Sequence, residues 1–168
     1  QTLAREELER EALEQNFPDG VNREQATWYH HAVADMMLLA GLVARANGCD
    51  FSASYWQRFQ SMLEFITSVM DVSGNVPAIG DADDGVFVRF DPTAELNVYR
   101  SLLATGAVLF DRGEFKFKAG AFDAKTRWLV GDTAEAKFAA LAANPGTLAL
   151  PPRRAFPQGG YCVLGGHF

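Results

Sequence analysis

The sequence has few cysteines, and the two that it has, Cys49 and Cys162, exclude a disulfide-rich scaffold and a cysteine-based zinc site. Long apolar runs are also missing. The longest one, residues 32–46, is interrupted by Asp35 and Arg45. A helix that crosses a bilayer needs about 20 consecutive apolar residues. We therefore expect no transmembrane segment and no membrane partner.

An excess of positive charge is missing as well, because the chain has 15 lysines and arginines but 21 aspartates and glutamates, which gives a net charge of −6. Proteins that bind nucleic acid by neutralising phosphates carry the opposite balance, so we expect no nucleic-acid partner. An acidic chain can still bind an anionic sugar polymer through a local basic patch. With 48% hydrophobic and 21% charged residues the composition is globular, and 168 residues fit one domain or a piece of a larger one.

Signatures of common catalytic and sorting functions are absent from the sequence. It contains no phosphate-binding GxxxxGK[ST], no HExxH, no GxSxG and no CxxC. Residues 1–16 are charged and lack the apolar region of a signal peptide. The sequence also has no initiator Met, and an extended run stands at its other end. We therefore expect this chain to be part of a longer protein.

Apolar residues at steps of three and four predict amphipathic helices over residues 3–15, 23–46 and 52–71. Because a short loop joins the second and third, we expect them to pack antiparallel as an αα-hairpin. The side chains expected to be buried between them are Met36, Met37, Phe59, Met62 and Ile66.

The rest of the chain predicts shorter elements. Asp91-Pro92 is a typical helix start and predicts a helix that continues to Phe110. Residues 112–131 are ambiguous, although the alternation at 115–118 suggests a short extended piece. A last short helix is expected from Asp132 or Thr133, and residues 161–164 are expected to form a strand. The predicted fold class is mainly α, with antiparallel helical hairpins and a short β segment at the C-terminus.

Polar side chains crowd the beginning of the predicted helix 23–46, where the sequence is EQATWYHH from Glu24 to His31. Because the N-terminal end of a helix is partly positive, it would stabilise a tyrosinate or a substrate carboxylate. Four-residue spacing places Gln25 and Tyr29 on one helix face, and His31 and Asp35 on another. The same spacing also fits a core tyrosine and a surface histidine–aspartate pair, and spacing alone favours that interpretation.

An acidic segment, GDADDG over residues 80–85, suggests calcium at first sight. The EF-hand template fails, because with Gly85 at loop position six the ligand positions one and three fall on Gly80 and Ala82. We expect a solvated turn or helix-capping carboxylates instead. No metal site and no cofactor are predicted.

Three segments resemble a known family. Residues 19–30 resemble the "DG…EQS…YH" segment of the heparinase II/III-like polysaccharide lyases, and residues 75–85 resemble their "P.iGD.DdG" loop. Residues 156–164 are similar to the "F…GGY.vlR" opening of their β domain. The three matches come in the family's order. Ala26 stands where the family often has Ser, and Gly165 replaces the frequent Arg after the strand.

The resemblance implies an (α/α) toroid over residues 1–146, then a linker and the first strand of a truncated β-sandwich domain over 147–168. It also implies β-elimination on an acidic, uronic-acid-containing polysaccharide by a periplasmic or secreted parent protein. A base removes the C5 proton of the uronate and an acid protonates the leaving oxygen. Tyr29 matches the family's catalytic tyrosine. The residues expected to support it by binding substrate are Arg23, Glu24, Gln25 and His30.

Other catalytic groups of the family are not matched in this chain. The Asn/His pair that neutralises the substrate carboxylate lies upstream, and a further histidine belongs to the β domain. We therefore expect the isolated chain to be inactive. The alternative is a non-catalytic carbohydrate-binding or scaffolding domain of the same fold. The polymer is left open between heparan-like, alginate-like and bacterial exopolysaccharides. Arg23, Arg89 and Arg100 are candidate anion contacts, although loop-pinning roles are more typical of such arginines.

Overall fold

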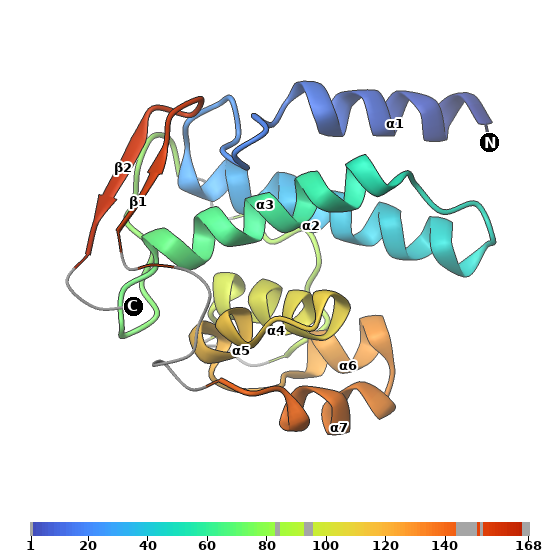
Figure 1. Ribbon diagram of the computed structural model, residues 1–168. Helices are drawn as coiled ribbons and strands as arrows, with labels where there is room; N and C mark the ends of the chain where they lie inside the picture. The colour runs from blue at the N-terminus through green and yellow to red at the C-terminus, as the bar shows by residue number, and fades with distance from the viewer. Residues whose placement is uncertain (1, 83–84, 93–95, 144–150, 152, 166–168) are drawn as a thin grey trace.

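The structure is a computed structural model that describes residues 2–82, 85–92, 96–143, 151 and 153–165. In this part of the chain, seven helices precede a two-stranded antiparallel sheet, as the predicted fold class requires (Figure 1). The elements are α1 (Thr2–Glu14), α2 (Thr27–Ala46), α3 (Ala53–Val69), α4 (Val98–Phe110), α5 (Gly113–Ala119), α6 (Ala124–Val130), α7 (Thr133–Ala140), β1 (Arg153–Phe156) and β2 (Tyr161–Leu164).

Helices α2 and α3 form the predicted antiparallel hairpin, which Figure 1 shows beside α1. Gly48 follows the last turn of α2 with a φ of 69°, a left-handed conformation that glycine adopts without a steric penalty. Ser52 then caps α3 by accepting a hydrogen bond from the backbone N–H of Tyr55.

The expected interface of the hairpin is confirmed except at one position. Met37, Phe59, Met62 and Ile66 are buried, but Met36 is 47% exposed. The prediction for Met36 was wrong because its side chain lines a groove between α1 and α2 that α1 covers incompletely. Helical spacing identified the apolar stripe of α2 but not how far its neighbours cover it.

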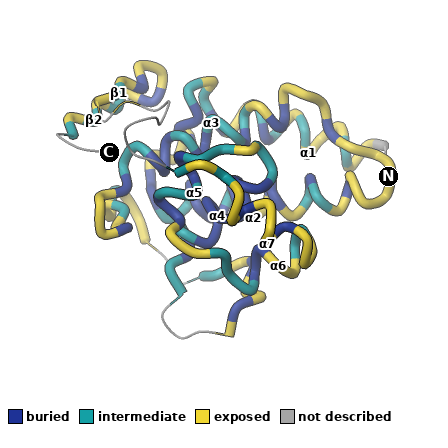
Figure 2. Tube along the Cα trace, turned by 60° about the horizontal axis from the view of Figure 1, so that its bottom comes forward, coloured by how far each residue is buried: buried dark blue, intermediate teal, exposed yellow. Residues whose placement is uncertain are grey.

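The core lies where α2 and α3 meet α4 and α5, and Figure 2 shows the buried segments gathered there. Helix α4 contacts α2 and α3 as well as α5, α6 and α7. Gly106 permits the close approach of α4 to α3, since a Cβ atom at this position would lie 2.3 Å from Leu63 Cδ1. None of the described helices combines the length and apolarity needed to cross a membrane.

Two elements in the second half of the chain differ from the prediction. Helix α4 begins at Val98 rather than after Asp91-Pro92, because Asn97 provides the cap: its side-chain oxygen accepts a hydrogen bond from Arg100 N at 3.0 Å. The extended piece expected at 115–118 is instead part of α5. The alternating pattern gave the wrong prediction because both lysines, as residues of a helix, have tertiary partners. Lys116 donates to carbonyls near the end of α7, and Lys118 donates to the carbonyl of Met70.

The β hairpin packs against the helical part beside the C-terminal half of α3 (Figure 1). The predicted strand 161–164 is β2, and its partner β1 lies in a segment that the sequence suggested to be a linker. Phe156 is fully buried against Phe65 of α3, and Arg154 donates to Glu64 at 2.7 Å. The proposed domain boundary at residue 146 lies outside the described residues and stays a prediction.

Candidate functional site

The polar segment around Tyr29 is shorter as a helix than predicted, because α2 begins at Thr27. Residues 23–26 lie before the helix, where Glu24 N donates to the side-chain oxygen of Asn22 at 3.0 Å. Gln25 has a φ of 59°, in the left-handed region that few non-glycine residues adopt. Gln25 and Tyr29 therefore do not share a helix face, and this part of the prediction was wrong.

Two distant segments hold the start of α2 in place. Thr27 Oγ1 donates to the carbonyl of Pro77 at 2.8 Å and accepts from Ile79 N at 3.2 Å, while Thr27 N donates to the carbonyl of Ile79 at 3.0 Å. From the other side, the hydroxyl of Tyr161 in β2 donates to the carbonyl of Gln25 at 3.2 Å. The first turn of α2 is therefore fixed by tertiary hydrogen bonds rather than by a side-chain cap.

His30 is buried and both of its ring nitrogens contact the backbone. Nδ1 accepts from Asn22 N at 3.3 Å, and Nε2 donates to the carbonyl of Met62 at 3.1 Å, which assigns the proton to Nε2. Burial lowers the pKa of His30 to about 4, although the Met62 hydrogen bond opposes this shift. In this geometry His30 joins the start of α2 to α3 as a neutral ring. Its expected contact with substrate stays a prediction.

Tyr29 lies in the first turn of α2 and is half-buried. The expected binding residues Arg23, Glu24 and Gln25 are exposed just before the helix. Arg23 is pinned, because its Nε donates to the carbonyl of Glu14 at 2.5 Å and its guanidinium lies 4.2 Å from the centre of the Phe17 ring. The catalytic role of Tyr29 and the binding roles of its neighbours stay predictions.

His31 and Asp35 share a face of α2 as their spacing predicts, but the surface interpretation was wrong because both are buried. Their Nε2 and Oδ2 atoms lie 3.4 Å apart, and Lys125 of α6 donates to Asp35 Oδ1 at 2.5 Å. Burial lowers the pKa of His31 to about 3, with a further decrease from the Lys125 ammonium group. This cluster holds α6 against α2.

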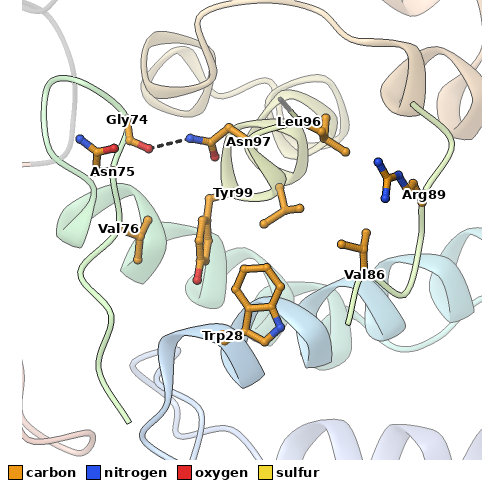
Figure 3. A pocket seen from close by; sticks show the side chains of 10 residues that line it. Trp28, Gly74, Asn75, Val76, Val86, Arg89, Leu96, Asn97 and Tyr99 are labelled. Atoms are coloured by element: carbon orange, nitrogen blue, oxygen red, sulfur yellow. Dashed lines mark hydrogen bonds between the residues drawn. The ribbon is translucent and has the colours of Figure 1, made fainter. Parts of the chain in front are cut away.

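A pocket of about 360 Å³ lies beside the start of α2 (Figure 3). The Trp28 and Tyr99 rings form one corner of it, with centroids 6.2 Å apart and planes nearly perpendicular. Its described lining consists of Trp28, Gly74, Asn75, Val76, Val86, Arg89, Leu96, Asn97, Val98 and Tyr99. This volume lies within the range of roughly 300–1,000 Å³ that is typical of small-molecule sites.

The three candidate anion-binding arginines have different surroundings. Arg100 donates to the carbonyl of Ser73 at 2.6 Å and so pins a loop, as Arg23 does at the end of α1. Arg89 lines the pocket, is exposed, and has no hydrogen-bonding or ionic partner among the described residues. Of the three, Arg89 is therefore the guanidinium that can receive an external anion.

Sequence reasoning did not find this pocket, because its walls come from residues far apart in the chain. Trp28 stands in the "DG…YH" segment and Asn75 in the "P.iGD" segment, but neither motif indicates that they meet Tyr99 of α4. The acidic residues Asp83 and Asp84, expected to form a structural turn, lie outside the described residues.

Comparison with known protein families identifies the family to which this chain belongs. A family model described as Heparinase II/III N-terminus matches residues 1–99, more than half of the chain. The chain therefore belongs to the heparinase II/III family, and the resemblance seen in the sequence is confirmed. The family relates it to polysaccharide lyases. No curated protein and no solved structure matches the chain.

Proposed function

We propose that this chain is the helical part of a lyase that cleaves a uronic-acid-containing polysaccharide by β-elimination, with Tyr29 as a catalytic acid or base. The supporting observation is that the family match covers the start of α2, where Tyr29 places a half-buried phenol in the first helical turn.

The local electrostatics support this role. The N-terminal end of a helix is partly positive, and Ala26 at the cap position has no side-chain oxygen to neutralise its N–H groups. Such a helix end favours bound anions, which include the carboxylate of a uronate. A phenol beside a uronate bound there can take the C5 proton or protonate the leaving oxygen.

The neighbouring residues take supporting roles in this proposal. Glu24 and Gln25 present exposed side chains just before the helix, where they can contact sugar hydroxyls. Arg23 and His30 hold the segment through their bonds to Glu14 and Met62. The proposed partners are an acidic polysaccharide and a β-sandwich domain of the same parent chain, and the proposed location is periplasmic or secreted.

The test is an elimination assay with the full-length protein. Each uronate polymer in a panel of heparan-like, alginate-like and other acidic polysaccharides is incubated with the protein, and absorbance of the unsaturated uronate product is followed. The proposal predicts a protein-dependent increase with at least one polymer and none with a neutral glucan. If no polymer is cleaved although one binds, the lyase proposal is wrong.

The alternative is a carbohydrate-binding domain without catalytic activity. The pocket beside Trp28 favours this function independently of Tyr29, because it offers aromatic walls and a free guanidinium. Binding of an acidic polysaccharide that survives replacement of Tyr29 by Phe, together with no product absorbance, would identify this alternative.

A further inference from the structure

We propose that the pocket between α2, α4 and the segments 74–76 and 86–89 is a separate subsite that binds one carboxylated sugar unit, with the carboxylate on Arg89 and the ring against Trp28 and Tyr99. The choice of a sugar as ligand depends on the proposed function. The choice of a carboxylate and the position of the subsite depend on the pocket itself.

The positive charge of the pocket lining favours a ligand that carries a carboxylate. Arg89 supplies the charge in the described lining, and none of the described lining residues is acidic. Its guanidinium has no competing partner among the described residues, and Figure 3 shows it on the side of the pocket opposite Val76 and Asn75. The planar guanidinium donates two parallel N–H bonds to one carboxylate, which gives it a geometric preference for this group.

The corner formed by Trp28 and Tyr99 favours a ligand with a ring. Trp28 and Tyr99 meet edge to face, so a flat apolar ligand face can lie against one ring while its edge contacts the other. The indole Nε1 of Trp28 is buried and has no hydrogen-bond partner in the described part of the chain. A ligand in the pocket cannot reach this atom, so the Trp28 ring rather than its N–H group makes the proposed contact.

The pocket wall is fixed before any ligand binds. Asn97 Nδ2 donates to the carbonyl of Gly74 at 2.9 Å, while Arg100 Nη2 donates to the carbonyl of Ser73. Asn75 donates to the carboxylate of Asp71 at 3.0 Å. These bonds hold the loop 71–75 against the start of α4. A preformed wall lowers the entropy cost of binding. This matters for a sugar, because a sugar buries little apolar surface.

The subsite is distinct from the face of Tyr29. Trp28 and Tyr29 are consecutive residues of α2, and consecutive side chains project about 100° apart on a helix. Tyr29 does not belong to the described lining of the pocket. Binding in the pocket and turnover at Tyr29 can therefore be measured separately.

The experiment uses a matched pair of probes and calorimetric titration of the 168-residue chain. One probe is a uronic-acid tetrasaccharide, and the other is the same tetrasaccharide with its carboxyl groups reduced to alcohols. We expect the acidic probe to bind about 10- to 100-fold more tightly, the factor that a hydrogen bond to a charged group provides. Arg89→Gln should remove this preference while it leaves the affinity for the reduced probe unchanged. Arg89→Lys should retain part of it, because the charge stays and the fork is lost.

The matched control is Arg153→Gln, which removes an exposed arginine from the hairpin, away from the pocket lining. This variant should bind both probes like the parent chain, and thermal unfolding should confirm that all variants fold. The proposal is overturned if the chain binds neither probe, if it does not distinguish them, or if Arg89→Gln retains the preference. Failure of the elimination assay with an intact Arg89-dependent preference would overturn the lyase proposal and leave the subsite standing.

Discussion

Lys125 Nζ lies 2.5 Å from Asp35 Oδ1, although the two residues are 90 positions apart and both side chains are buried. The pair connects α6 to α2, on the face of α2 that also carries His31. Removing two charges from water costs free energy, and this cost is offset only as long as the charges remain paired.

Removal of the cation from this pair should destabilise the protein strongly. Lys125→Met leaves the Asp35 carboxylate buried without its partner, and we expect a loss of about 3–5 kcal/mol in the free energy of unfolding. Urea denaturation followed by circular dichroism measures it. The double variant Lys125→Met with Asp35→Leu should recover most of the loss, because no uncompensated charge remains. A single variant within ~0.5 kcal/mol of the parent would show that the pair is hydrated in solution.

Phe59 should be a major contributor to the core. It is fully buried and its ring contacts those of Trp56 and Phe110, so Phe59→Ala should lower the free energy of unfolding by about 3–5 kcal/mol. Met36→Ala on the exposed side of α2 is the control and should cost much less, within ~0.5 kcal/mol. Equal losses in the two variants would contradict the assigned burial.

The buried neutral His30 should make stability depend on pH. Its pKa is about 4 in the folded protein and about 6.5 in the unfolded chain, so the unfolded state binds a proton first as the pH falls. The neutral His30 ring stabilises the folded state fully above pH ~6.5. This contribution to the free energy of unfolding, about 3 kcal/mol, is lost as the pH falls from ~6.5 to ~4. Denaturant unfolding from pH 4 to 8 measures the slope. His30→Gln should reduce the slope without removing it, because burial also lowers the pKa of His31 to about 3. An unchanged slope would mean that His30 does not contribute to it.

Tyr29→Phe should separate catalysis from folding. The ring stays and the phenol oxygen is lost, so turnover of the full-length protein should fall by about 10²–10⁴ while the melting temperature is retained. The matched control is Tyr55→Phe, because the hydroxyl of Tyr55 is buried and donates to the carbonyl of Met37 at 2.7 Å. That variant should lose about 1–3 kcal/mol of stability and keep its turnover. Parallel losses of stability and turnover in Tyr29→Phe would instead assign a structural role to Tyr29.

The candidate site was only partly predictable, and Gln25 and His30 show why. Both stand in a motif that the sequence made visible, but the helix was expected to include Gln25. The turn before α2 depends on hydrogen bonds that Asn22 and Ile79 accept and on one that Tyr161 of the hairpin donates. His30 was expected to face substrate, and only the position of α3 shows that its Nε2 contacts Met62. Local patterns contain no information about such distant partners.

The sequence by itself determined the mainly helical class, the α2–α3 hairpin and the family. These properties depend on apolar periodicity and on residues close together in the chain, which act before any tertiary contact forms. Tertiary structure alone decided the burial of Asp35 with Lys125 and the meeting of Trp28, Arg89 and Tyr99 around one pocket. The physical reason is that burial and ligand geometry depend on which elements pack together, and packing joins residues whose separation in the sequence carries no periodic signal.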